Sequence, residues 1–427
     1  MKIISRLILL FITMIAMIAC SNEQQSKIIT DLKPTVILIS IDGFRNDYLE
    51  KLPVPNLLSL AKKGVHTALI SVFPSVTFPN HYSIATGLYP EHHGIMLNEF
   101  LVSGIKEPFT HHGHAPVVTD PRWWQGEPIW VTAEKQGQLT ASAFWPSSES
   151  SIKGVKPTYY QKFAEDGDPQ QRVQKILHWL DLPVEKRPTF LALYFENVDN
   201  AGHRSGPDSK EMRHAAINID NAIGALLLGL KERGIESSIN LVIVSDHGMS
   251  KVDPKKVIDL NKLVNKNSIA ITGEGAIVGV YPKPGQLNVV YQLLRKSNAP
   301  MVVYRGSDIP SKLHYQYPHR TPPILCVANE QAFILGKDRK LQGGTHGYDP
   351  ELKSMQGIFI AYGPAFKTKY TRSPFRNINI YSLLTYILGL KSAQNDGSLQ
   401  EVRDVLVLNM RTMNYFSANK KSSSDNP

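Results

Sequence analysis

The chain has 427 residues, of which 42% are hydrophobic and 20% are charged. This composition excludes a disordered or collagen-like protein, and the length allows about two or three domains or one large α/β domain with insertions. The 47 basic residues outnumber the 37 acidic residues, so the formal net charge is +10. No run of five basic residues occurs, so this surplus favours anionic ligands in general and predicts no nucleic-acid groove. Two cysteines exclude a disulfide-dense scaffold.

The N-terminal segment has the features of a targeting signal. Two basic residues precede an apolar run over residues 7–19, which is too short to span a bilayer and has the length of a signal-peptide core. The run ends at Cys20 and resembles a bacterial lipoprotein signal. That resemblance implies a signal peptide over residues 1–19, a lipid on Cys20, a flexible tether over residues 20–33 and a place on the periplasmic face of the outer membrane. Ordinary secretion and an uncleaved anchor are the alternatives.

Three continuous apolar runs predict strands that are buried on both faces of a parallel sheet. They cover residues 35–41, 189–195 and 240–245. Each run leads to an aspartate at or just beyond its carboxyl end, namely Asp42, Asp199 and Asp246. Ligands bind at this edge in open α/β sheets, so these strands predict the position of a functional site.

Helical patterns alternate with these strands. Apolar residues recur at helical spacing over residues 57–61, 173–180, 212–230 and 380–388. The first pattern stops at Gly64, a residue suited to a left-handed helix C-cap. The alternation predicts an α/β fold with a doubly wound, mostly parallel sheet flanked by helices. Short strand-like runs predict a smaller α+β lobe inserted at about residues 261–343 of a domain over residues 34–427, with a disordered tail at residues 420–427.

Six side chains at or after the strand ends have the donor atoms of metal ligands: Asp42, Asp199, His203, Asp246, His247 and His346. Imidazole and carboxylate ligands without thiolates fit Zn²⁺ in a catalytic site. Asp199 and His203 are four residues apart, which places both on one side of a helical turn. Taken singly, each residue has an ordinary explanation, such as a turn former. Their occurrence together predicts two zinc ions, each with about three protein ligands.

Thr77 is the candidate nucleophile for a two-metal site, which favours in-line displacement at phosphorus. Pro79 suits the start of a helix whose first residues follow Thr77. A hydroxyl at this position lies in the positive field of the helix N-terminus, and coordination to zinc would lower its pKa further. A simple N-cap is the alternative role for Thr77. Ser75 and Ser83 are the alternative nucleophiles.

Five segments together resemble the bacterial nucleotide pyrophosphatase/phosphodiesterase family, which belongs to the alkaline phosphatase superfamily. They are VILISIDGFR at residues 36–45, FPSVTFPNH at 73–81, TGLYPEHHGI at 86–95, VSDHGM at 244–249 and THGYD at 345–349. The resemblance covers about residues 34–390 and implies an alkaline phosphatase-like core. The domain over residues 34–427 is thereby expected to be a phosphodiesterase catalytic domain.

The resemblance also implies roles for individual residues. Thr77 would be esterified by the substrate phosphate and would also contact the zinc pair. One zinc would be held by Asp42, Asp246 and His247, and the other by Asp199, His203 and His346. Asn98 would donate its amide to a non-bridging phosphate oxygen, as in an oxyanion hole.

Two aromatic residues are expected to hold a nucleobase. Phe78 matches a family aromatic that stacks on one face of the base, although core packing is its alternative role. Tyr160 is expected to stack on the other face, with Tyr159 as the reserve. Because such a sandwich reads a π-face, it predicts tolerance among nucleotides.

These features predict a zinc-dependent hydrolase that cleaves phosphodiester or pyrophosphate bonds of nucleotides. A covalent threonine-nucleotidyl intermediate would form and release a nucleoside monophosphate. One alternative is a phosphodiesterase for lysophospholipids or choline-phosphate diesters, and another is a non-catalytic surface lipoprotein that keeps the fold. His111, His112 and His114 are expected in a solvated loop rather than in a third metal cluster. The roles of Trp123, Trp124 and Trp130, cleft or core, stay open from the sequence.

Overall fold

The computed structural model describes residues 28–407, except for residues 103, 106, 111–115, 164–166 and 337–339. Several predictions therefore lie outside the described residues: the signal peptide, lipidation of Cys20, the tail at residues 420–427 and the roles of His111, His112 and His114. Within the described part, every helix is too short or too polar to cross a bilayer.

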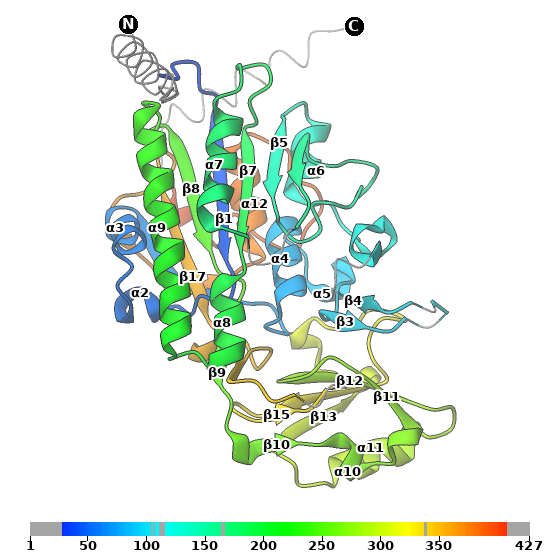
Figure 1. Cartoon of the computed structure of the whole chain (residues 1–427). Helices are drawn as coiled ribbons and strands as arrows, with labels where there is room; N and C mark the ends of the chain where they lie inside the picture. The colour runs from blue at the N-terminus through cyan, green and yellow to red at the C-terminus, as the bar shows by residue number, and fades with distance from the viewer. Residues whose placement is uncertain are drawn as a thin grey trace, which may run out of the picture.

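One nine-stranded sheet forms the centre of the molecule (Figure 1). In spatial order its strands are β18 (Tyr370–Thr371), β2 (Val65–Ile70), β17 (Gly357–Tyr362), β8 (Ile239–Val244), β1 (Thr35–Ile41), β7 (Phe190–Phe195), β5 (Thr140–Ala143) and β6 (Tyr159–Gln161), and β19 (Phe375–Arg376) also pairs with β2. The strands from β8 to β6 are parallel, whereas β17 is antiparallel to both β8 and β2. The predicted mostly parallel α/β sheet is thus confirmed.

Helices cover both faces of this sheet, as expected for a doubly wound fold (Figure 1). The helices on one face are α3 (Pro55–Lys63), α7 (Pro169–Leu180), α8 (Asn197–Ser205) and α9 (Lys210–Glu232). Those on the other face are α4 (Thr77–Thr86), α6 (Ile129–Lys135) and α12 (Asn379–Ile387). The short helices α2 (Tyr48–Lys51) and α5 (Pro90–His93) lie in the connections.

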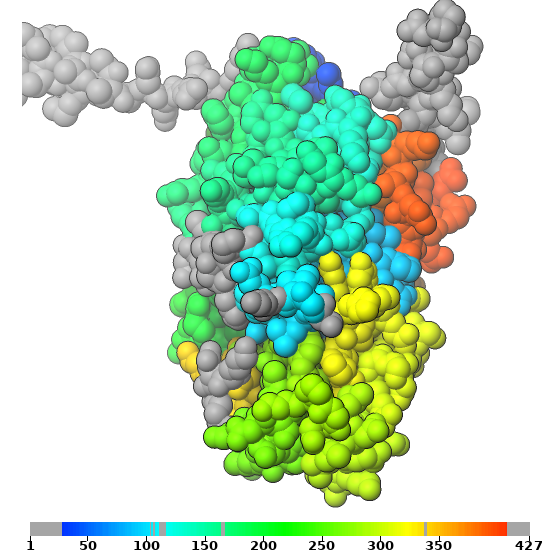
Figure 2. Space-filling view, turned by 90° about the vertical axis from the view of Figure 1, so that its right-hand side faces the viewer, coloured from blue at the N-terminus to red at the C-terminus, as the bar shows by residue number. Residues whose placement is uncertain are grey.

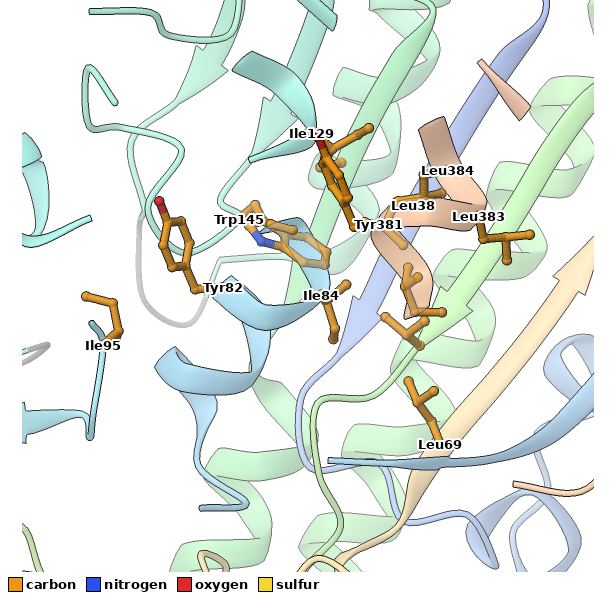
Figure 3. Packing of buried hydrophobic residues seen from close by; sticks show 14 of the residues in the cluster. Leu38, Leu69, Tyr82, Ile84, Ile95, Ile129, Trp145, Tyr381, Leu383 and Leu384 are labelled. Atoms are coloured by element: carbon orange, nitrogen blue, oxygen red, sulfur yellow. The ribbon is translucent and has the colours of Figure 1, made fainter. Parts of the chain in front are cut away.

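The central strand β1 divides the apolar residues into two cores. Alternate side chains of a strand point to opposite faces, so Val36 and Leu38 face one core while Ile37 and Ile39 face the other. Every residue of β1 is buried, which explains its uninterrupted apolar sequence. Figure 3 shows part of the first core, where Leu38 lies near side chains of α12 such as Leu384.

Helix α3 stops at Gly64, but the predicted left-handed cap is wrong. Gly64 has φ −103° and ψ −136°. A Cβ atom at this position would lie 2.2 Å from the carbonyl oxygen of Ala361 on β17. The close approach of two backbones, and not a positive φ, therefore requires glycine here.

A second, smaller sheet lies beyond the carboxyl edge of the main sheet (Figure 1). The part of the chain that contains it, coloured from yellow-green to yellow, forms the bottom of the molecule in the space-filling view (Figure 2). Its antiparallel strands are β11 (Ile269–Thr272), β12 (Ile277–Pro282), β14 (Ile324–Ala328) and β13 (Met301–Arg305), with helices α10 (Leu260–Leu263) and α11 (Leu287–Arg295) beside them. We call residues 257–336 the lobe. Cys326 is buried in its core, and burial raises the pKa of this thiol to about 12. Cys326 is therefore a core residue with an unreactive thiol.

Side-chain contacts join the lobe to the rest of the chain. Three short two-stranded pairs lie nearby, and each has both strands inside the lobe or both outside it. The pairs are β10 (Val257–Ile258) with β15 (Phe333–Ile334), β9 (Ser250–Lys251) with β16 (Gly344–Thr345), and β3 (Glu99–Phe100) with β4 (Phe109–Thr110). Arg320 of the lobe donates to the carbonyl oxygens of Gly94 and Trp123 at 2.8 and 2.6 Å. The lobe therefore has a fixed position against the loops that follow β2.

Candidate active site

Strands β1 and β8 bring three of the predicted ligands together at the carboxyl edge of the sheet. Asp42 follows β1, and Asp246 and His247 follow β8, which pairs with β1 in parallel. All three side chains are buried, and one ligand atom from each lies within 4.8 Å of the others. We call this set the strand triad.

The other three predicted ligands form a second set, which we call the helix triad. Asp199 and His203 lie one turn apart on α8, and His346 directly follows β16. Their ligand atoms also lie within 4.8 Å of one another. The rings of His247 and His346 stack with centroids 3.6 Å apart, so the two triads adjoin. The structure thus groups all six predicted ligands as the family resemblance implies.

The three histidines are oriented by hydrogen bonds at Nδ1. His346 Nδ1 lies 2.8 Å, and His247 Nδ1 2.9 Å, from a backbone carbonyl oxygen. His203 Nδ1 lies 2.7 Å from Gln342 Oε1. Because these oxygens accept, Nδ1 carries the hydrogen, and Nε2 of a neutral ring is left with its lone pair. Such support from outside the ligand set is typical of metal-binding histidines.

Each Nε2 atom faces a carboxylate oxygen. His247 Nε2 lies 3.4 Å from Asp42 Oδ1, and His346 Nε2 lies 3.6 Å from Asp199 Oδ1. These two carboxylate oxygens are buried and accept no hydrogen bond. Facing acceptors repel one another, and an unpaired buried carboxylate oxygen costs free energy unless a cation lies between them. The donor set therefore fits two Zn²⁺ ions, whose usual ligands in proteins are imidazole and carboxylate.

The electrostatics of the strand triad indicate the same need for a cation. Burial raises the pKa of Asp42 well above its usual value, and the nearby carboxylates of Asp246 and Asp199 raise it further. The hydroxyl of Tyr194 donates to Asp42 Oδ2 at 2.6 Å, which acts in the opposite direction. Burial also raises the pKa of Tyr194, so this hydroxyl stays protonated and remains a donor.

Thr77 is the first residue of α4, and its hydroxyl points at the strand triad. Thr77 Oγ1 lies 3.2 Å from His247 Nε2. The alternative N-cap role is wrong, because Val76 is the N-cap and makes no side-chain cap. Of the two competing serines, Ser75 donates to the Tyr348 carbonyl oxygen and Ser83 contacts a buried histidine. Thr77 lines the cavity beside the triads, whereas Ser75 and Ser83 do not.

The triads open into a cavity of about 720 Å³ between the sheet and the lobe. Asn98 lines this cavity, and its Oδ1 accepts from the backbone N–H of Phe78 at 2.9 Å. This contact fixes which side of the amide is the donor side. Phe78 is partly buried, lines the cavity and stacks with Trp124 at a centroid distance of 6.2 Å. Both residues therefore line the same cavity as the triads.

The position predicted for Tyr160 is wrong. Tyr160 lies in β6 at the edge of the sheet, is 37% exposed and packs against the Lys156 ammonium, 5.0 Å from the ring centre. Tyr159 also points elsewhere, since its hydroxyl donates to the Lys186 carbonyl oxygen. Instead Phe163 lines the cavity, and its N–H donates to Glu149 Oε1 at 2.6 Å. The chain leaves β6 after Gln161 and turns toward the cavity. The alternation of side chains along the strand does not predict this change of direction.

The cavity wall carries more acidic than basic side chains. Among its described residues, Arg204 is the one lysine or arginine. The carboxylates are Asp42, Asp199, Glu99, Glu149, Glu196 and Glu274. The basic surplus of the chain is therefore not concentrated at this site, and metal ions would supply the positive charge.

The three tryptophans whose roles stayed open pack in the core. Trp123, Trp124 and Trp130 are buried, and the described cavity wall contains Trp145 in their place. Three further residues of the site were missed by sequence reasoning: Tyr194, Gln342 and Phe163. Tyr194 had a signal, because a tyrosine in the otherwise apolar run FLALYF needs a polar partner when it is buried.

Comparisons with known proteins agree with this geometry. Residues 36–349 match the family model for type I phosphodiesterase / nucleotide pyrophosphatase. The human ectonucleotide pyrophosphatase/phosphodiesterase family member 5 is 34% identical over 374 residues, which cover 87% of this chain and 78% of that protein. Mouse bis(5'-adenosyl)-triphosphatase enpp4 is 37% identical over 383 residues, which cover 88% and 82%. The structure of murine family member 5 matches with a TM-score of 0.83 and 34% identity, over 87% of this chain and 100% of that one.

The fold and the paired triads define a phosphodiester hydrolase with an alkaline phosphatase-like core. The chain belongs to the type I phosphodiesterase / nucleotide pyrophosphatase family. The alternative of a non-catalytic surface protein is therefore not supported. The relatives cited above are from human and mouse, so the bacterial origin suggested by the leader stays a prediction.

Proposed function

We propose that this chain is a zinc-dependent enzyme that hydrolyses nucleotide phosphodiester or pyrophosphate bonds through an ester on Thr77. The observation that carries the proposal is the 3.2 Å contact between Thr77 Oγ1 and His247 Nε2 within the strand triad. A hydroxyl held there lies beside residues that would hold a metal ion, and Thr77 lines the cavity. Bound zinc would polarise the phosphoryl oxygens and lower the pKa of the threonine hydroxyl.

Individual residues of the chain would have distinct roles in the reaction. Thr77 Oγ1 attacks phosphorus and its hydroxyl proton passes to water, while the bond from phosphorus to the leaving oxygen breaks and that oxygen keeps the electron pair. The resulting ester is hydrolysed by water, which regenerates Thr77 and releases a nucleoside monophosphate. The Asn98 amide, oriented by the N–H of Phe78, donates to a non-bridging oxygen. Phe78 offers an aromatic face to the base, supported from behind by Trp124.

Two relatives support a nucleotide substrate. Murine family member 5 was solved with AMP as an inactive threonine-to-alanine variant, and this structure matches the chain with a TM-score of 0.84. The mouse relative is named a bis(5'-adenosyl)-triphosphatase. Together with Phe78 in the cavity wall, they favour nucleotides over choline-phosphate diesters.

Replacing the nucleophile tests the proposal. Thr77→Ala should lower the rate on the p-nitrophenyl ester of AMP by at least about 1,000-fold, because the covalent step is lost. Zinc content measured by elemental analysis should stay unchanged, since all six triad residues remain. Ser75→Ala and Ser83→Ala are matched controls that should keep the activity. Turnover by Thr77→Ala at the unaltered rate would contradict a threonine mechanism.

A further inference from the structure

The position of Thr77 assigns a direction to the reaction. Attacking and leaving oxygens lie on opposite sides of phosphorus in an in-line displacement. Thr77 contacts the strand triad through His247, so attack comes from that side. The leaving oxygen therefore lies toward the helix triad of Asp199, His203 and His346.

Arg204 lies on this leaving side. It directly follows His203 in the last turn of α8, is exposed and lines the cavity. No other described residue forms an ion pair or hydrogen bond with its side chain. Glu274, a carboxylate of the same cavity wall, accepts from Gln342 at 3.0 Å. The guanidinium is thus available to a ligand.

We infer that Arg204 forms a subsite for a phosphate in the leaving group, which deepens and rests on the proposed function. The planar guanidinium donates two parallel hydrogen bonds to phosphate oxygens. When ATP is cleaved, the bond from Thr77 Oγ1 to the α-phosphorus forms and the bond to the β-phosphate oxygen breaks. Pyrophosphate leaves with the electron pair, and Arg204 offsets its negative charge without transferring a proton.

This subsite indicates the preferred class of substrate. Nucleoside polyphosphates and dinucleoside polyphosphates carry an anionic leaving group, whereas a choline-phosphate diester leaves an uncharged alcohol. Arg204 would assist only the former. This selection depends on Arg204, because it is the one lysine or arginine among the described residues of the cavity wall, whose other such charged side chains are carboxylates.

A matched pair of substrates tests the inference. ATP and the p-nitrophenyl ester of AMP share the transferred nucleotide and differ in the leaving group, and AMP release is measured for both. Arg204→Ala should lower kcat/KM for ATP by about 10-fold, as expected for an exposed charge-assisted contact. The ester should change by less than about twofold. Added salt should weaken the preference for ATP in the unaltered chain but not in the variant.

Two further variants complete the test. Arg204→Lys should keep part of the preference for ATP over the ester, because lysine keeps the positive charge but lacks the two parallel N–H donors of the planar guanidinium. Arg213→Ala on α9, an exposed arginine outside the cavity, should change neither rate. An equal loss on both substrates, or no loss on ATP, would overturn the inference while leaving the proposed function intact. If the unaltered chain hydrolyses neither substrate, the proposed function fails and the inference with it.

Discussion

Tyr194 illustrates how residues outside the triads determine their properties. Its hydroxyl donates to Asp42 Oδ2 at 2.6 Å, and Asp42 is a candidate metal ligand in the strand triad. The bond directs Asp42 Oδ1, the oxygen without a hydrogen bond, toward the His247 side. Metal affinity should therefore depend on a residue that donates no ligand atom.

Replacing this tyrosine tests that dependence. Tyr194→Phe should weaken zinc affinity by about 10- to 100-fold, because the orienting hydrogen bond is lost. Competition with a zinc chelator measures the affinity. Tyr159→Phe is the matched control, since its hydroxyl donates to the Lys186 carbonyl oxygen away from the cavity. Equal affinities in the Tyr194 and Tyr159 variants would show that Tyr194 does not orient the ligand.

The candidate metal ligands were easier to predict from sequence than the residues that contact them or line the cavity. Asp42 and Asp246 follow buried strands directly, so the apolar runs alone place them at one edge of the sheet. The contact of Gln342 with His203 joins residues that are 139 positions apart in the chain. The local sequence pattern therefore cannot predict it. Phe163 was missed because a turn after β6, rather than the alternation of the strand, determines where it lies.

At the scale of elements, continuous apolar runs predict the strands β1, β7 and β8, but β17 and its direction were not predicted. The run GIFIAY forms β17, which lies antiparallel between β8 and β2. A buried strand reads as a continuous apolar run whichever way it points. Direction depends on the connections, and the lobe between β8 and β17 gives the chain enough length to enter β17 from either end.

Gly64 provides a test of packing between α3 and β17. Gly64→Ala should lower the free energy of unfolding by about 1–3 kcal/mol, because the added Cβ atom would overlap the Ala361 carbonyl oxygen. Urea denaturation measures the change. Ser59→Ala in the same helix is the control and should lie within about 0.5 kcal/mol of the unaltered chain. An unchanged free energy of unfolding in Gly64→Ala would mean that β17 shifts to make room for the new methyl group.

At the scale of the whole molecule, the N-terminus of the described chain and the site lie at opposite edges of the sheet. Strand β1 begins at Thr35 and ends beside Asp42, and seven residues of strand span about 20 Å. We propose that Cys20 carries a lipid, as the leader predicts. An anchor on that side would hold the cavity away from the membrane and open to dissolved nucleotides.

The anchor has a direct test. Cys20→Ser should move the protein from the membrane to the soluble fraction without changing its rate on the p-nitrophenyl ester, because the folded part is untouched. Fractionation followed by immunoblotting measures the distribution. Ser21→Ala keeps the cysteine and should stay with the membrane. Membrane association of the Cys20→Ser variant would count against lipidation.

The central claim is that a covalent ester on Thr77 lies between substrate and product. Each in-line displacement inverts phosphorus, so two successive displacements restore its configuration. The most direct measurement is the hydrolysis of a nucleoside phosphorothioate ester of known configuration in ¹⁸O-labelled water, with the product configuration determined by ³¹P NMR. Net retention is the predicted result. Net inversion would show that water attacks the substrate directly and would contradict the role assigned to Thr77.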